Sequence, residues 1–87
     1  MATEEPLNHR QLAVSLFNRT WELLDQATRS EEEKAEMLTA AFASRHHWRE
    51  VGEPRNFAIS EWQVSRVAAV LGYPDLAAEY GQRSLKT

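Results

Sequence analysis

Hydrophobic residues recur three or four positions apart along most of the chain, and this spacing predicts helices rather than strands. β-branched residues never alternate with polar ones over the length of a strand, and only three glycines and three prolines interrupt the sequence. Four helices are expected, at about residues 6–26, 30–51, 54–71 and 74–85. The short links between them favour antiparallel neighbours. The predicted fold class is therefore all-α, with two stacked antiparallel helical hairpins, about 6–51 and 54–85, in a single domain over residues 1–87.

The residues between these segments are typical of helix boundaries. Ser30 and Glu33 have the spacing of a capping box, and the acids that follow Ser30 lie at the positive end of a helix dipole. Asn8 or Thr3 is expected to cap the first helix. Two glycines are expected to end helices and two prolines to open them: Gly52, Gly72, Pro54 and Pro74.

Two helices have an unusual distribution of side chains. The middle of the second helix, residues 37–43, is apolar all round, which predicts burial on more than one side. The fourth helix carries a stripe suited to close packing, formed by Ala77, Tyr80, Gly81 and Ser84.

Composition narrows the class of protein. Hydrophobic residues make up 43% and charged residues 26%, as in globular domains. A net charge of -3 argues against a nucleic-acid partner, because phosphate binding needs a clustered excess of Lys and Arg. No cysteine is present, which excludes disulfides and thiol chemistry and fits a cytoplasmic location. The start, MATEEPLNHR, has no signal-peptide pattern, and no apolar stretch is long enough to span a membrane.

The segment EWQVSRVAAVLGYPDLAAEYGQRSL, residues 61–85, resembles one tetratricopeptide repeat. Trp62 stands near the aromatic position of the first helix, Gly72 in the turn and Ala77 at the alanine position of the second helix. The large aromatic residue of that helix, Tyr80, comes one place early, with Gly81 where it is expected, and no proline follows the repeat. The resemblance implies a tetratricopeptide-like arrangement of the two hairpins.

Four further segments are similar to those of a group of small bacterial helical proteins without an established activity. They are NRTWELL, ASRHHW, VGEPRN and EWQVSRV, within residues 18–71. The chain departs from that group at Phe42, where a histidine is common, and members usually continue for further helices. The resemblance to this group therefore implies a helical fold for the chain but no enzymatic activity in particular.

A binding surface is expected on the first helix of the repeat-like segment. The resemblance places Trp62 and Arg66 on the concave side, four residues apart, as an aromatic platform with a cation for a peptide or an acidic group. The other interpretation is that Trp62 belongs to the core and the Arg66 stem covers it. Five polar residues are expected to extend the surface: Asn18, Arg19, Glu22, Arg55 and Asn56.

The stretch SRHHWREVGEPRN, residues 44–56, invites a search for a metal site. Neighbouring helical residues point about 100° apart, so His46 and His47 cannot readily chelate one ion from one helix. Glu50 has suitable spacing to either histidine, but no His-Glu-x-x-His motif occurs. No metal, cofactor or catalytic residue is predicted. His46, His47 and Trp48 are expected at the edge of the core, and become binding residues only where they face a groove or a second subunit.

The favoured function is a non-enzymatic module for protein binding or self-association. Stacked hairpins usually need about three repeats, so a homodimer through the last hairpin or the second helix is expected. The alternative is a small metal-dependent or acid–base enzyme that uses His46, His47 and Glu50, alone or across a dimer interface. A regulatory subunit or the front of a longer repeat array is a third possibility.

Overall fold

The computed structural model of the protein describes residues 8–86, which form four helices and contain no strand. The predicted all-α class is therefore confirmed for this part of the chain. The expected start of the first helix near Pro6 and the candidate cap Thr3 lie outside the described residues. The helices are α1 (His9–Asp25), α2 (Glu31–Val51), α3 (Pro54–Leu71) and α4 (Pro74–Lys86).

Capping boxes fix the first residues of α1 and α2. The Asn8 side chain accepts a hydrogen bond from the backbone N–H of Gln11 at 2.8 Å, and the Gln11 side chain accepts one from the Asn8 N–H at 3.0 Å. Ser30 and Glu33 are joined in the same reciprocal way. The backbone N–H of Ser30 lowers the pKa of the Glu33 carboxyl group. The predicted box at Ser30 is confirmed, and Asn8 is the cap of α1.

Glycines end α2 and α3 for different physical reasons. Gly72 has φ +86°, a left-handed conformation that disfavours other residues because of their Cβ atom. Gly52 has φ -85°, so its conformation is ordinary. A Cβ atom on Gly52 would instead lie 2.7 Å from the carbonyl oxygen of Trp48. Space therefore selects glycine at position 52, and dihedral angle selects it at position 72.

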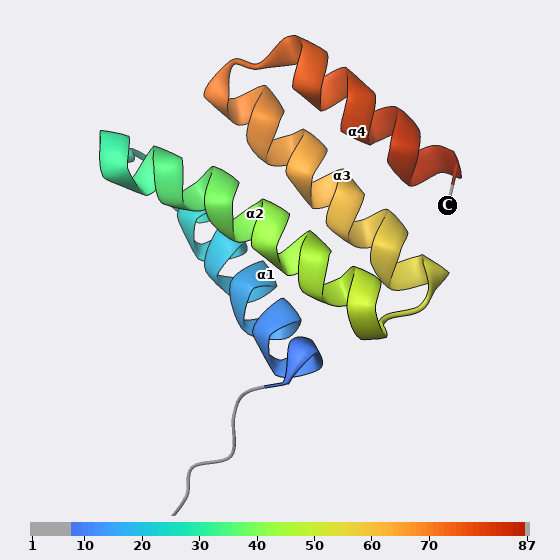
Figure 1. The fold of residues 1–87 in the computed structure, drawn as a ribbon. Coiled ribbons are helices and arrows are strands. Elements are labelled where there is room, and N and C mark those ends of the chain that lie inside the picture. Colours follow the sequence, from blue (N-terminus) through green and yellow to red (C-terminus); the bar gives the residue numbers. More distant parts are fainter. Residues whose placement is uncertain (1–7, 87) are drawn as a thin grey trace, which may run out of the picture.

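The helices follow one another as antiparallel neighbours (Figure 1). α2 packs against both α1 and α3, and α4 packs against α3. The apolar middle of α2 accordingly faces two helices, as its composition predicted. The buried core consists of Leu23 on α1, Met37 and Ala41 on α2, and Val64 and Val67 on α3.

α3 and α4 approach closely through small side chains. The Ser65 hydroxyl donates a hydrogen bond to the Ala77 carbonyl oxygen at 2.6 Å, and a Cβ atom on Gly81 would lie 3.3 Å from the same hydroxyl. The opposite side of α4 carries the exposed residues Asp75, Ala78, Glu79, Gln82 and Lys86, with Leu85, which is 86% exposed, beside them. α4 is therefore packed on one side only.

A buried carboxylate ties α3 to α2. The Glu61 side chain is 3% exposed, and its carboxylate accepts a hydrogen bond from Arg45 at 3.1 Å. Arg49 lies 4.0 Å from the same oxygen. The Arg45 guanidinium also stacks on the Tyr80 ring of α4 at 5.2 Å from the ring centre. Three helices thus meet at this ion pair.

No helix within residues 8–86 is long and apolar enough to cross a lipid bilayer.

Candidate protein-binding surface

Two stripes of side chains, one on α1 and one on α3, form a surface that we call the α1–α3 face. Residues three and four apart share one side of a helix. The stripe on α1 consists of Val14, Phe17 and Trp21, and the stripe on α3 consists of Ile59, Trp62 and Arg66. Because both helices are antiparallel to α2, they run in the same direction (Figure 1), and the stripes lie alongside each other. The side chain of Gln63 joins them by donating a hydrogen bond to the Phe17 carbonyl oxygen at 3.1 Å.

Aromatic rings occupy the centre of the α1–α3 face. The ring centres of Trp21 and Trp62 lie 5.6 Å apart with a 40° tilt, and Phe17 meets Trp21 edge to face at 6.2 Å. Trp62 remains 47% exposed, in contrast to the core residues Val64 and Val67 on the same helix. Of the two interpretations left open for Trp62, surface placement is therefore the one observed.

A hollow of about 160 Å³ adjoins these rings, and its lining comes from three helices. Phe17 and Ile59 form its sides, and the nearly buried Trp48 contributes from α2. The fourth lining residue, Asn56, is held in place because its side-chain oxygen accepts a hydrogen bond from the Glu53 N–H at 2.9 Å. Trp48 and Asn56, both expected as binding residues, are thus brought together at one end of the α1–α3 face.

Three arginines border this surface. The Arg10 guanidinium lies 5.4 Å from the centre of the Trp48 ring and donates a long hydrogen bond of 3.5 Å to the Val51 carbonyl oxygen. Arg55 and Arg66 are exposed on the same side of α3 as Trp62, and within residues 8–86 neither forms an ion pair. Asn18, also exposed, stands one helical turn before Trp21, and Asp25 one turn after it. The border is therefore mainly basic and polar.

Arg19 does not belong to this surface, although the sequence suggested it. Its guanidinium donates two hydrogen bonds to the Glu36 carboxylate on α2, at 2.7 and 3.0 Å, and one to Glu22 at 3.1 Å. These bonds raise the pKa of Arg19 and lower that of Glu36. The residue links α1 to α2, on the side of α1 away from Trp21, because positions 19 and 21 differ by about 200° around a helix.

The histidines form a separate cluster, in which His9 joins the two residues noted in the sequence. The Nδ1 atoms of His9 and His47 are 2.8 Å apart, and the rings of His46 and His47 lie 5.1 Å apart. Glu50 is exposed. In the described part of the chain, no three His, Asp or Glu side chains are arranged to hold a metal ion.

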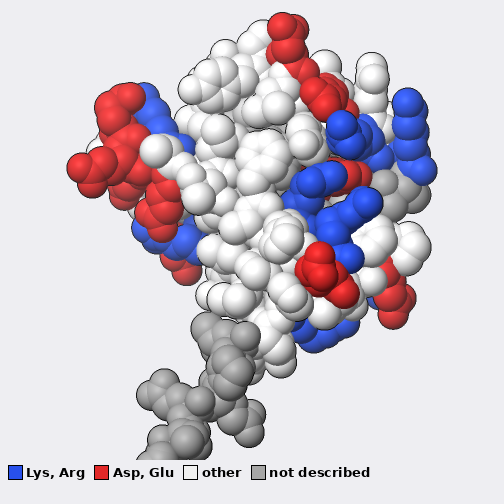
Figure 2. Space-filling view, in the orientation of Figure 1, with Lys and Arg blue, Asp and Glu red and all other residues white. Residues whose placement is uncertain are grey.

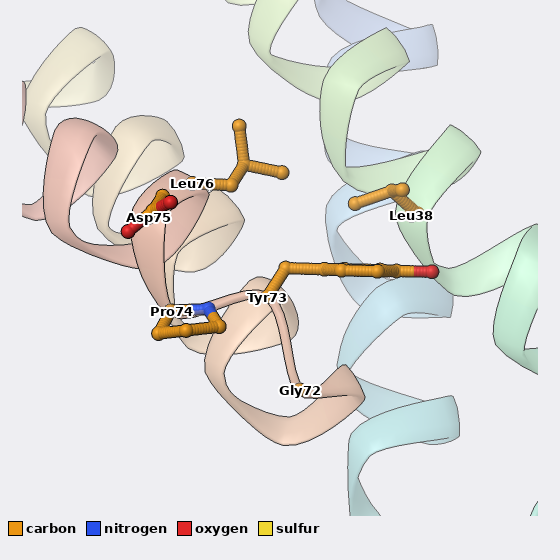
Figure 3. A pocket seen from close by; sticks show the side chains of 6 residues that line it. All are labelled: Leu38, Gly72, Tyr73, Pro74, Asp75 and Leu76. Atoms are coloured by element: carbon orange, nitrogen blue, oxygen red, sulfur yellow. The ribbon is translucent and has the colours of Figure 1, made fainter.

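A second hollow, of about 430 Å³, lies between α2 and the α3–α4 turn. Figure 3 shows the Tyr73 ring reaching from the turn toward Leu38 of α2, with Leu76 on the same side and Asp75 at the rim. Figure 2 shows charged side chains at the start of α2 and near the end of α4, with an area of uncharged residues between these two groups. Sequence patterns did not indicate this hollow, because Tyr73 lies in a turn and Leu38 in a helix that was expected to be buried on more than one side.

No family model matches the sequence, and comparisons with curated proteins and with solved structures also give no match.

Proposed function

We propose that the protein is a non-enzymatic interaction module and that the α1–α3 face binds a segment of a partner protein. One observation carries the proposal: the half-exposed Trp62 rests on Trp21, next to a hollow that Trp48 lines. Aromatic rings that remain exposed around a concave site are typical anchors of protein interfaces, since they bury a large area with little loss of side-chain freedom. A cytoplasmic location is part of the proposal and is supported by the lack of cysteine.

The chemistry of the partner segment follows from the border of the α1–α3 face. An apolar side chain would fill the hollow beside Phe17 and Ile59. Acidic side chains would pair with Arg55 and Arg66, which have no carboxylate partner within residues 8–86. A segment that combines acidic and apolar residues therefore fits best.

We further propose that the two hairpins are stacked as in tetratricopeptide repeats. Three features support this arrangement: the left-handed Gly72 between α3 and α4, the close contact of Gly81 with Ser65, and the contact of α1 with α3 through Trp21 and Trp62. In such an arrangement the first helices of successive hairpins share one surface.

A second copy of the chain is the other candidate occupant. Several apolar side chains on or beside the α1–α3 face are exposed, among them Val14, Ile59 and Trp62. α2 packs between α1 and α3, and most exposed residues on the outer side of α4 are polar. The α1–α3 face combines several exposed apolar side chains and includes α3 of the last hairpin, through which the sequence predicted a dimer. A homodimer would therefore use the α1–α3 face in a two-fold contact. Light scattering after size-exclusion chromatography distinguishes it from a monomeric binding module.

Affinity capture with matched variants tests the proposal. The wild-type protein, Trp62→Glu and the control Gln82→Glu are each immobilised and exposed to an extract of the native cell. Gln82 lies on the outer side of α4, so Gln82→Glu adds the same charge away from the proposed surface. We expect a protein that the wild type and the control retain and that Trp62→Glu loses. Equal retention by all three would contradict the proposal.

A further inference from the structure

The cluster of His9, His46 and His47 joins the start of α1 to the end of α2. His9 is the first residue of α1, and the two hairpin helices are antiparallel, so it meets the last turns of α2. His9 and His47 share a hydrogen bond of 2.8 Å between their Nδ1 atoms. The ring centres of His9 and His46 lie 6.2 Å apart, which places three imidazoles within one small volume.

The shared hydrogen bond requires a particular protonation state. One Nδ1 atom must carry hydrogen and the other must offer a lone pair, so at least one of the two rings has to be neutral. When both rings are protonated, each Nδ1 atom is a donor, the bond is lost, and two positive charges face each other. A third charge on His46 adds to the repulsion.

The surroundings of His47 oppose its protonation in the folded protein. Burial and the charges of His46 and His9 lower the pKa of His47, while Glu50 raises it. Because the pKa of His47 is lowered on folding, the unfolded chain binds more protons. The contribution of neutral His47 to the free energy of unfolding is therefore complete above the ordinary histidine pKa of about 6.5. This contribution is lost as the pH falls below that value.

The residues that follow His9 and His47 in the sequence contact each other beside the hollow of the α1–α3 face. Arg10 follows His9 and stacks on Trp48, which follows His47 and lines the hollow. A shift of the first turn of α1 away from α2 would remove this stack and open that end of the hollow.

We propose that His9 and His47 form a proton-sensitive clasp, which holds the start of α1 on α2 at neutral pH and releases it at mildly acidic pH. The clasp is independent of the proposed function. Only its effect on partner binding rests on that function.

Urea unfolding at pH 7.5 and 5.5, in buffer with EDTA, tests the clasp. In His47→Asn, an amide that forms hydrogen bonds but does not titrate in this range replaces the imidazole. Gln82→Asn, on the outer side of α4, is the control. We expect acidification to raise the unfolding equilibrium constant of the wild type about threefold more than that of His47→Asn, because the unfolded chain binds more protons than the folded one. Gln82→Asn should retain the wild-type response.

Amide hydrogen exchange gives the local readout. At pH 5.5, residues 9–17 should exchange faster in the wild type than in His47→Asn, while α4 should exchange equally in both. His9→Asn, a change at an exposed residue, should reproduce the result if His47→Asn folds poorly. Equal pH responses of the wild type and both clasp variants would overturn the proposal. Whether the wild type still retains its captured partner at pH 5.5 tests only the link between the clasp and the proposed function. The hydrogen-exchange result tests the clasp whatever the outcome of that capture.

Discussion

The rings of Trp21 and Trp62 lie 5.6 Å apart across α1 and α3, and Trp62 remains 47% exposed. An aromatic pair of this kind stabilises a fold by about 0.5–1.5 kcal/mol beyond its buried area. The pair therefore adds a modest stabilising contact between α1 and α3, and it leaves about half of Trp62 exposed.

Replacement of Trp62 should separate binding from folding. Trp62→Ala is expected to lower the free energy of unfolding by about 1 kcal/mol, because much of the ring is already in solvent. Leu23→Ala, which empties a fully buried position, should cost about 2–5 kcal/mol. Urea denaturation of both variants provides the comparison. A loss for Trp62→Ala as large as that for Leu23→Ala would show that Trp62 belongs to the core.

The Glu61 carboxylate should be the most sensitive charge in the molecule. Glu61→Gln leaves Arg45, itself only 21% exposed, without its charged partner. Breaking a buried ion pair typically costs about 3–5 kcal/mol. The exposed pair of Glu79 and Arg83 offers a matched control, and Glu79→Gln should leave stability nearly unchanged. Similar melting curves for the two variants would contradict the assigned role of Glu61.

The turn after α3 should depend on the left-handed angle of Gly72. Gly72→Ala is expected to lower the free energy of unfolding by about 1–2 kcal/mol. Gly72→Asn should lose less, because asparagine adopts this conformation more readily. Steric crowding cannot explain this difference between the two variants. Apart from Gly72 itself and its two chain neighbours, no residue has a heavy atom within 4 Å of the position of a Cβ atom on Gly72. Equal losses for the two variants would show that the dihedral angle is not the cause.

The helices and most of their ends could be predicted because their signals are local. Apolar spacing, the Ser30 box, Pro54, Pro74 and Gly72 each act within a few residues. The side chains that meet between helices were harder to predict. Arg19 pairs with Glu36, and His9 with His47, and both contacts depend on how α1 crosses α2.

The candidate surface was only partly predictable for the same reason. Spacing placed Trp62 and Arg66 on one side of a helix, but nothing in the local sequence linked them to Phe17 or Trp21. In the sequence, Phe17 and Trp21 belong only to the apolar spacing that predicts the first helix. Only the parallel course of α1 and α3 brings the two stripes together (Figure 1).

Site-specific photo-crosslinking in the native cell tests the α1–α3 face most directly. A photoreactive side chain replaces Ile59, which lines the hollow, or Ala78, which lies on the outer side of α4. We predict a crosslinked product from position 59 and none from position 78. A product at twice the mass of the chain would identify a second copy, and any other mass a different partner. Crosslinks from position 78 alone, or from neither position, would contradict the account.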